Sequence, residues 1–500
     1  MNKKIKMIIF TLICSLTIVT TKVSAEGLSL SSPKVNITTS KEWNVKFNAS
    51  LKVDTINDKS ITVKDENNKI IPVSVTMGKS PDTVVISPEV SGYEPNKKYN
   101  LIIGTDVQSI DGKKLSSPME MQFTTNNKYE DGSNYENLPQ IVSCKFEYLP
   151  LLSTQKQVFN LKTNIGQDVE YRIFVHSYSM DKDSYTEVTN GYTKSSDGKI
   201  TANKTLDAGS SGQKYKVLMY VKKLGNVGTH KDINTDYDNY YVDYFRCINS
   251  ADTNNNEYEN YNISVDQMTD IQTKLSDKSV FVETNDFNNA ASKNQIKYYL
   301  DPNNFMDSYG KYQFLKLSYT DGMNVDQVNS ILKGKGILDG KGQAFLDAAK
   351  NNNVNIVYLI SHSLLETGNG TSLLANGGQK DSSGKYIFGA PVYNFFGIGA
   401  YDKDPNYYGT KAAYDNKWLT PEDAINGGTQ WIASKYINNP NGKQDTLYKM
   451  RWNPSNPGEH QYATDVAWSY KQIPNMIKGI TNIIDQVKDI KLNFQIPKFK

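Results

Sequence analysis

The feature that most constrains the fold of this chain is a change in its hydrophobic period. Up to about residue 250, apolar and polar residues alternate in short runs bounded by Asn, Asp and Gly, as in Trp43–Phe47. That alternation is typical of half-buried strands. From about residue 285, apolar residues recur three and four positions apart, as in Val325–Leu332, which is the spacing of an amphipathic helix. We therefore expect a β-rich N-terminal half and an α-rich C-terminal domain.

The first 25 residues have the pattern of a secretory signal. Lys3, Lys4 and Lys6 precede an apolar run over Met7–Val19, and Val23–Ala25 supplies a small-x-small cleavage site. The run is shorter than the ~20 residues that span a bilayer, and no other segment is long and apolar enough to do so. We expect a secreted protein with no membrane span once the signal is removed.

Charge excludes one class of partner. The formal net charge is +3, and the four lysines of residues 1–25 contribute +4 with no acid beside them, so the remainder of the chain is at −1. A nucleic-acid-binding protein would be strongly basic. We therefore expect no nucleic-acid partner.

The organisation follows from these patterns and from the polar, Asn-rich stretches between them. At ~150 residues per domain, 500 residues have room for roughly three domains. The expected divisions are a signal peptide at 1–25, a β-sandwich at 26–125, a linker at 126–138, a second β-rich module at 139–250, a linker and lead-in at 251–284, an α-rich domain at 285–480 and a C-terminal extension at 481–500.

Individual elements are also predicted. The clearest strands are Trp43–Phe47, Ser60–Val63, Thr83–Ile86, Tyr99–Ile103, Met121–Thr124, Glu170–Val175, Lys214–Val221 and Tyr240–Phe245. The clearest helices are Val325–Leu332, Gln343–Lys350, 354–366 and 421–437. The last has Pro421 in its first turn behind Thr420 as N-cap.

Cysteine and histidine usage limits the chemistry. Removal of the signal leaves only Cys144 and Cys247, which either pair with each other or are two buried thiols. Neither lies in the α-rich domain, so a cysteine nucleophile is excluded there. Only four histidines are present and the His-Glu-x-x-His pattern is absent. We expect no metal and no cofactor.

The densest chemistry lies in Ile360–Ser372, where an apolar helix ends in glycine. Glu366 falls on the side away from the apolar stripe, and His362, four residues earlier, shares its face. Gly368 and Gly370 allow a sharp exit from the helix. A glutamate in a last turn is ordinarily a solvated surface residue. One that is partly desolvated at such an end suits a general acid.

A second segment supports that interpretation. Val392–Asp402 places two glycines among four aromatic residues, which is unusual for a core strand. Such a composition suits a cleft wall where backbone donors and flat rings meet a sugar. The alternative is a buried hairpin.

These segments carry a resemblance to a known family. Four blocks in order over roughly 200 residues resemble the endo-β-N-acetylglucosaminidases of glycoside hydrolase family 73, which are bacterial autolysins with a lysozyme-like fold. The blocks are Leu364–Ala375, Tyr393–Asp402, Tyr448–Pro454 and His460–Asp465. A weaker resemblance links 26–125 to bacterial Ig-like domains, through Phe47–Leu51, Ile86–Pro88, Tyr99–Leu101, Asp111–Leu115 and Phe123–Thr125.

The strand patterns and the two resemblances together predict a multidomain protein, with two N-terminal β-sandwich-like modules followed by an α-rich (α+β) lysozyme-like catalytic domain. The glucosaminidase resemblance covers about 285–480 and implies nothing about the N-terminal half. It implies cleavage of the β-1,4 bond between N-acetylglucosamine and N-acetylmuramic acid in peptidoglycan glycan strands, with Glu366 as the catalytic acid. Family members often have a tyrosine where this chain has Trp468. The expected substrate-binding residues are Asn394, Phe395, Phe396, Gly397, Tyr401, Trp431, Tyr462 and Trp468.

The second catalytic group is left open. Inverting glycosidases place a base carboxylate ~6.5–9.5 Å from the acid, and retaining ones a nucleophile at ~5–5.5 Å. Asp402 and Asp465 are the favoured candidates, with Asp381 and Asp404 behind them. Alternatively the 2-acetamido group of the substrate attacks, and one protein carboxylate suffices.

Two other functions remain in competition. A lytic transglycosylase or muramidase-type enzyme would share the acid but give different product ends. A non-catalytic surface protein would bind the cell wall through the β modules. In each case we expect a secreted, wall-associated protein.

Overall fold

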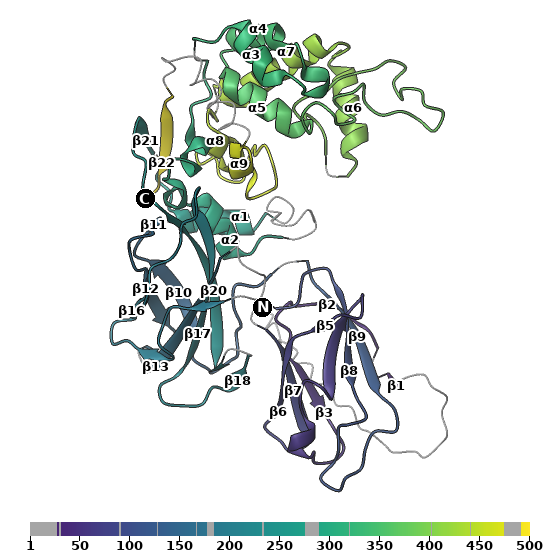
Figure 1. The fold of residues 1–500 in the computed structure, drawn as a ribbon, viewed down its shortest axis with the longest axis vertical. Helices are drawn as coiled ribbons and strands as arrows, with labels where there is room; N and C mark the ends of the chain where they lie inside the picture. Colours follow the sequence, from purple (N-terminus) through teal and green to yellow (C-terminus); the bar gives the residue numbers. More distant parts are fainter. Residues whose placement is uncertain are drawn as a thin grey trace, which may run out of the picture. The chain divides into compact units, whose positions relative to one another are not determined.

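The computed structural model describes most of the chain and shows two compact units (Figure 1). The described ranges are 28–29, 32–89, 92–127, 129–166, 168–177, 185–232, 235–275, 290–319, 321–401, 403–440, 442–474 and 492–500. The first unit takes the described residues up to 206 with 213–245 and 290–295, and the second takes 207–212, 246–275 and the described residues from 296 onward. The predicted signal peptide lies outside these ranges. Over the part of the chain that is described, no helix has the length and apolar character needed to span a bilayer.

The N-terminal module consists of two sheets around one core. Its strands are β1 (Leu28–Ser29), β2 (Lys34–Ile37), β3 (Trp43–Lys46), β4 (Ile61–Asp65), β5 (Ile70–Ile71), β6 (Val73–Met77), β7 (Thr83–Pro88), β8 (Lys98–Ile103) and β9 (Met119–Thr125). One sheet has the order β1-β9-β8-β4-β5, with β2 also on β9, and the other has the order β3-β7-β6. Trp43 from one sheet packs on Phe123 from the other at 4.9 Å between ring centroids. The five strands predicted here are confirmed.

The second module is also built from strands. They are β10 (Ile141–Phe146), β11 (Leu151–Leu152), β12 (Val158–Thr163), β13 (Val169–Ser177), β14 (Thr186–Glu187), β15 (Thr193–Lys194), β16 (Lys199–Thr201), β17 (Gln213–Lys223), β18 (His230–Lys231), β19 (Asp236–Tyr237) and β20 (Asn239–Ile248). The larger sheet has the order β11-β20-β17-β13-β14, with β15 also on β13, and a smaller sheet has the order β10-β12-β16. The tyrosine-rich run predicted at Tyr240–Phe245 lies in β20, between β11 and β17, and Tyr240 and Tyr244 are buried.

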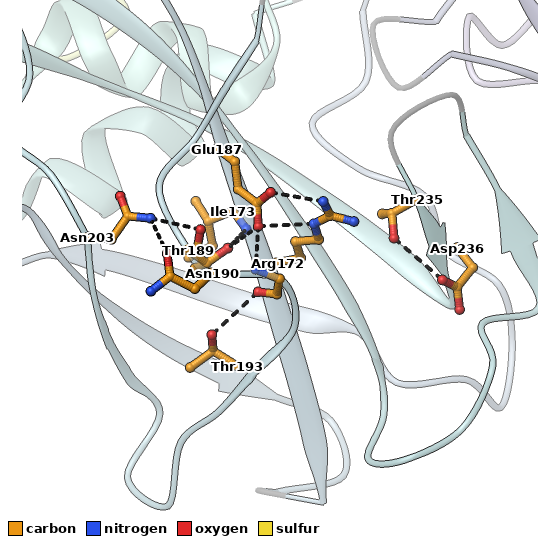
Figure 2. A network of polar contacts seen from close by, with 10 residues as sticks. Arg172, Ile173, Glu187, Thr189, Asn190, Thr193, Asn203, Thr235 and Asp236 are labelled. Atoms are coloured by element: carbon orange, nitrogen blue, oxygen red, sulfur yellow. Dashed lines mark hydrogen bonds and ion pairs between the residues drawn. The ribbon is translucent and has the colours of Figure 1, made fainter.

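A polar network fixes the edge of the larger sheet (Figure 2). Arg172 on β13 donates to Glu187 on β14 through Nε at 3.1 Å and Nη2 at 2.9 Å, a two-pronged charged pair. The Thr189 hydroxyl and the Gly191 N–H donate to the same carboxylate. Since each oxygen of Glu187 is engaged, its pKa is held below the usual range, against the opposing effect of burial, which is the largest single influence.

The two cysteines are structural. Cys144 on β10 and Cys247 on β20 are buried thiols. Burial raises the pKa of Cys247 to about 12, so it stays protonated and unreactive. Of the two sequence alternatives, the structure gives buried thiols and not a disulfide.

The C-terminal half is mainly helical. It contains β21 (Asn256–Asn260), α1 (Val265–Thr273), α2 (Lys293–Leu300), α3 (Val325–Leu332), α4 (Gly342–Asn351), α5 (Ile356–Glu366), α6 (Pro405–Asp415), α7 (Pro421–Ile432), α8 (Leu447–Trp452), α9 (Trp468–Lys471) and β22 (Phe494–Lys498). Helix α4 packs against α3, α5 and α7. All four predicted helices are confirmed. The Thr420 side chain caps α7 by accepting from the Asp423 N–H, and a π-turn over Ala433–Ile437 extends the helix.

The expected linker and lead-in at 251–284 and the expected extension at 481–500 both contain regular elements where they are described. Residues 256–260 form β21, which pairs in parallel with β22 near the chain end, and 265–273 form α1. Lys449 on α8 fixes this pair to the domain: its buried ammonium lies 2.6 Å from Glu259 and 2.9 Å from Asp445. The described residues of both segments, 251–275 and 492–500, therefore belong to the C-terminal unit.

Candidate active site

Helix α5 ends at Glu366, and the turn after it holds this end in one conformation. The Thr367 hydroxyl donates to the Ser363 carbonyl and accepts from the Gly370 N–H at 2.8 Å. Gly370 has a φ of +79°, and a Cβ there would lie 2.1 Å from the Lys335 carbonyl oxygen. Only glycine fits such a position. The turn thus fixes the last residue of the helix.

The Glu366 carboxyl lies between a buried histidine and the backbone of the aromatic loop. Its side chain is 25% exposed, and Oε1 is 3.6 Å from His362 Nε2. On the other side, a Cβ at Gly397 would lie 2.8 Å from Oε2. The shared face of His362 and Glu366 predicted from their spacing is confirmed. The carboxyl is therefore flanked by His362 and Gly397 and is still partly exposed to solvent.

A hydrogen-bonded chain of three side chains holds the His362 ring. The Tyr358 hydroxyl is 2.8 Å from Nδ1, the Tyr462 hydroxyl is 3.2 Å from Nε2, and the same Tyr462 hydroxyl donates to the Phe396 carbonyl at 2.7 Å. Since the Tyr462 hydrogen is committed to that carbonyl, Nε2–H donates to Tyr462 and Tyr358 donates to Nδ1. This assignment places the ring proton of a neutral His362 on the nitrogen that faces Glu366.

Burial keeps both phenols protonated. It raises the pKa of Tyr358 and of Tyr462 well above the usual range, and the nearby Glu366 charge adds to the effect. Tyr358 was not predicted from the sequence. The signal for it was present, because Tyr358, His362 and Glu366 follow one another at four-residue spacing along one helix face.

Aromatic rings surround the hydrogen-bonded side chains Tyr358, His362 and Tyr462. Trp468 is 8% exposed and lies 6.0 Å from the His362 ring and 5.0 Å from the Tyr462 ring, between centroids. Tyr436 contacts Tyr462 at 5.1 Å, and Trp431 contacts Tyr436 at 5.8 Å. The structure thus brings predicted residues Tyr462 and Trp468 to the histidine behind Glu366, with Trp431 farther along the same cluster.

Three residues of the aromatic loop that were predicted to bind substrate are buried instead. Asn394, Phe395 and Phe396 are 2%, 0% and 1% exposed. The Asn394 amide donates to the carbonyls of Ile398 and Gly409 and accepts from the N–H of Ile398. These residues therefore support the loop from inside. The prediction was wrong because composition does not distinguish residues that line a cleft from residues that pack behind its lining.

The remaining predicted loop residues lie toward solvent. Gly397 is partly exposed beside Glu366, and Tyr401 is 68% exposed. The two are only four residues apart, so the loop leads from the carboxyl to an open surface.

The candidate second carboxylates have structural roles where they are described. Asp465 Oδ2 is 2.6 Å from the Lys471 ammonium, and Oδ1 accepts from the Ala467 N–H. Asp404 caps α6 by accepting from the Tyr407 N–H. Asp381 caps a turn, and a hydrogen bond from Ser383 holds its pKa below the usual range. Asp402 lies outside the described residues.

Metal chemistry gains no support from the ligand types. Within the described ranges, no three His, Cys, Asp or Glu side chains are grouped as ligands of one ion would be. The expected absence of a metal and a cofactor stays a prediction.

Two families match the chain. Residues 342–482 match the glucosaminidase family, described as mannosyl-glycoprotein endo-beta-N-acetylglucosaminidase, and residues 19–125 match a bacterial Ig-like domain. The glucosaminidase match contains α4 through α9, and with them Glu366, His362 and Tyr462.

Curated relatives match the C-terminal part. A Beta-N-acetylglucosaminidase of Bacillus subtilis is 50% identical over 212 residues, which are 42% of this chain and 23% of that protein. A Bifunctional autolysin of Staphylococcus aureus is 40% identical over 252 residues, 49% of this chain and 19% of that protein. The aligned part thus spans less than a quarter of either relative.

A solved structure also matches. A catalytic mutant of S. aureus Autolysin E, crystallised with the disaccharide NAG-NAM, is 33% identical with a TM-score of 0.40. The match covers 48% of this chain and 99% of that one.

Proposed function

Since residues 342–482 form a domain of the glucosaminidase family and 19–125 an Ig-like domain, we propose that the protein is a secreted peptidoglycan hydrolase. It cleaves the β-1,4 bond between N-acetylglucosamine and N-acetylmuramic acid. The names of the two curated relatives, a β-N-acetylglucosaminidase and an autolysin, support this substrate class. The observation that carries the proposal is a single partly exposed carboxyl, Glu366, at the end of a buried helix.

Glu366 acts as the general acid. Its proton passes to the glycosidic oxygen, and the bond from C1 to that oxygen breaks with both electrons leaving on the oxygen. His362 is a positioning residue, because its ring, held by Tyr358 and Tyr462, is 3.6 Å from the carboxyl.

The substrate supplies the second group. The 2-acetamido oxygen bonds to C1 from the opposite face and forms an oxazolinium ion. Water then attacks C1, the bond from C1 to the acetamido oxygen breaks with its electrons returning to the acetamido group, and ionised Glu366 takes the proton that the water loses. The engagement of Asp465 with Lys471 supports this route over one that uses Asp465 as nucleophile or base. Asp402 would take that role in the alternative route.

The domains divide the work. The two β modules form sandwiches that hold the enzyme on the cell wall, and the helical domain has a lysozyme-like fold. Tyr401, Trp431, Tyr462 and Trp468 line or back the sugar site. Deletion of the Ig-like domain should weaken sedimentation of the mature chain with purified walls. Equal sedimentation of the two proteins would refute the wall-binding role.

Mass spectrometry of borohydride-reduced peptidoglycan digests tests the reaction. The mature protein should produce reduced N-acetylglucosamine ends, and Glu366→Gln should produce none. Reduced muramic ends or anhydro ends from the mature protein would indicate a muramidase or a lytic transglycosylase. No new ends from either protein would support a non-catalytic wall-binding protein.

A further inference from the structure

The exposed aromatic residues of the C-terminal unit are concentrated next to the catalytic loop. Among its described residues, the large hydrophobic side chains that are exposed are Tyr258, Leu373, Tyr401, Tyr407, Tyr414 and Leu419. All but Tyr258 fall within 47 consecutive positions. Tyr401, Tyr407 and Tyr414 are 68%, 39% and 45% exposed, so part of each side chain is open to a ligand. Single exposed aromatics need no explanation, whereas a group of them marks a binding surface.

These rings form one continuous row with two neighbours. Centroid distances are 5.7 Å from Tyr401 to Tyr408, 5.3 Å from Tyr408 to Tyr407, 6.0 Å from Tyr407 to Phe388 and 5.0 Å from Phe388 to Tyr414. We call these five residues the aromatic row. Each ring is in van der Waals reach of the next, so the row presents a connected surface.

The helix geometry fixes the spacing of the row. Tyr407 and Tyr414 both lie on α6 (Figure 1) and are seven residues apart, two turns along one face. Seven residues rise by about 10.5 Å, which is of the order of one disaccharide. Phe388 packs against both tyrosines and fills the interval.

The row is joined to the active-site loop by contacts between the loop and α6. The Asn394 amide, which organises the loop around Gly397, also donates to the Gly409 carbonyl of α6 at 3.1 Å. A Cβ at Gly399 would lie 2.7 Å from Ala412 on α6. Loop and helix therefore meet closely. The row begins at Tyr401, four residues beyond the glycine that touches Glu366.

Two charged groups of α6 are engaged within the protein. Lys411 is paired with Asp415 at 2.6 Å, and Asp404 is engaged as the helix cap. Tyrosine has a flat apolar face and a polar tip, so the row can stack on the apolar faces of sugar rings.

We propose that the aromatic row binds the glycan strand outside the cleaved bond, so that the enzyme grips at least one further disaccharide. This inference rests on the proposed function, since the strand is the substrate of the neighbouring site. It predicts a preference for long strands over short ones, because a short substrate that fills the site cannot reach the row.

The test compares two substrates and two variants. Tyr407→Ala with Tyr414→Ala should raise the half-saturating concentration of purified sacculi by about tenfold, the loss expected when ring stacking is removed. The loss on a peptidoglycan tetrasaccharide should be at least several times smaller. Tyr258→Ala removes an equally open tyrosine, 55% exposed and outside the row, and should act as the mature protein does. Equal losses of the double variant on both substrates, or no loss, would overturn the proposal.

Binding without turnover separates this inference from the proposed function. In a Glu366→Gln background, sedimentation with amidase-treated glycan strands, which lack stem peptides, should weaken with the double variant. The mature protein could fail to cleave peptidoglycan while the double variant still weakens binding. In that case the row binds glycan, and the proposed hydrolase reaction is refuted. If binding needs the stem peptides, a peptide occupies the row and the proposal fails.

Discussion

Gly397→Ala tests whether the loop backbone sets the position of the Glu366 carboxyl, the proposed general acid. The added Cβ would lie 2.8 Å from Glu366 Oε2, where ordinary contact begins at 3.4 Å. Either the carboxyl or the loop must therefore move by about 0.6 Å, the difference between those two distances. A displacement of ~1 Å at a reacting group costs up to ~10²-fold in rate, so we expect a loss of about tenfold. Gly397 also has a φ of +65°, and alanine there costs about 1 kcal/mol of stability.

The control separates the contact from the backbone effect. Gly340 has a φ of +72° in the same unit, and a Cβ there has nothing within 4 Å. Gly340→Ala should lower stability by a similar ~1 kcal/mol and leave the rate unchanged. The assay is the initial rate of sacculus solubilisation at saturating substrate, with melting temperature measured in parallel. If the two variants lose activity equally, or Gly397→Ala is as active as the parent, the loop does not position Glu366.

Three further predictions address the histidine chain, the helix end and the first unit. Tyr358→Phe removes the hydroxyl that donates to His362 Nδ1. We expect a changed pH profile of kcat/KM and a stability loss of about 1 kcal/mol by urea unfolding. An unchanged pH profile would mean that the His362 ring does not need the hydrogen bond from Tyr358. Gly370→Ala places a Cβ 2.1 Å from the Lys335 carbonyl at a φ of +79°; we expect a stability loss above ~2 kcal/mol in thermal unfolding, and a full-strength melting transition would contradict the turn geometry. Burial raises the pKa of Asp131 to about 6, so between about pH 4 and that value the folded chain holds a proton that the unfolded chain has released. The contribution of Asp131 to stability therefore falls by up to about 3 kcal/mol as pH rises through that window and is level above it. Asp131→Asn should remove this contribution, which is measured as the difference between the two proteins in urea unfolding below and above the window.

The sequence predicted the elements in which local pattern and tertiary packing agree. In β3, the alternation from Trp43 to Lys46 matches alternating burial and exposure. In α7, Thr420 and Pro421 mark the first turn because a cap and a fixed φ act within a few residues. The pairing of β21 with β22 was not predictable in this way. Asn256–Asn260 is polar except for the exposed Tyr258, and the strand exists because a segment more than 230 residues later pairs with it.

In the candidate site, too, the residues set by local spacing were predictable and those set by tertiary contacts were not. Glu366 and His362 could be placed together because four-residue spacing on a helix is a local rule, and the structure puts Nε2 3.6 Å from the carboxyl. The aromatic loop has no such rule. Phe395, Phe396 and Tyr401 look alike in sequence, yet two are buried and one is 68% exposed, because Asn394 turns the backbone through bonds to Ile398 and Gly409. An asparagine whose side chain bonds only to main-chain groups is not part of any repeating pattern in the sequence, so sequence analysis cannot identify its role. For this reason Asn394 was predicted to bind substrate, although its role in the structure is to hold the loop backbone that sets which rings are exposed.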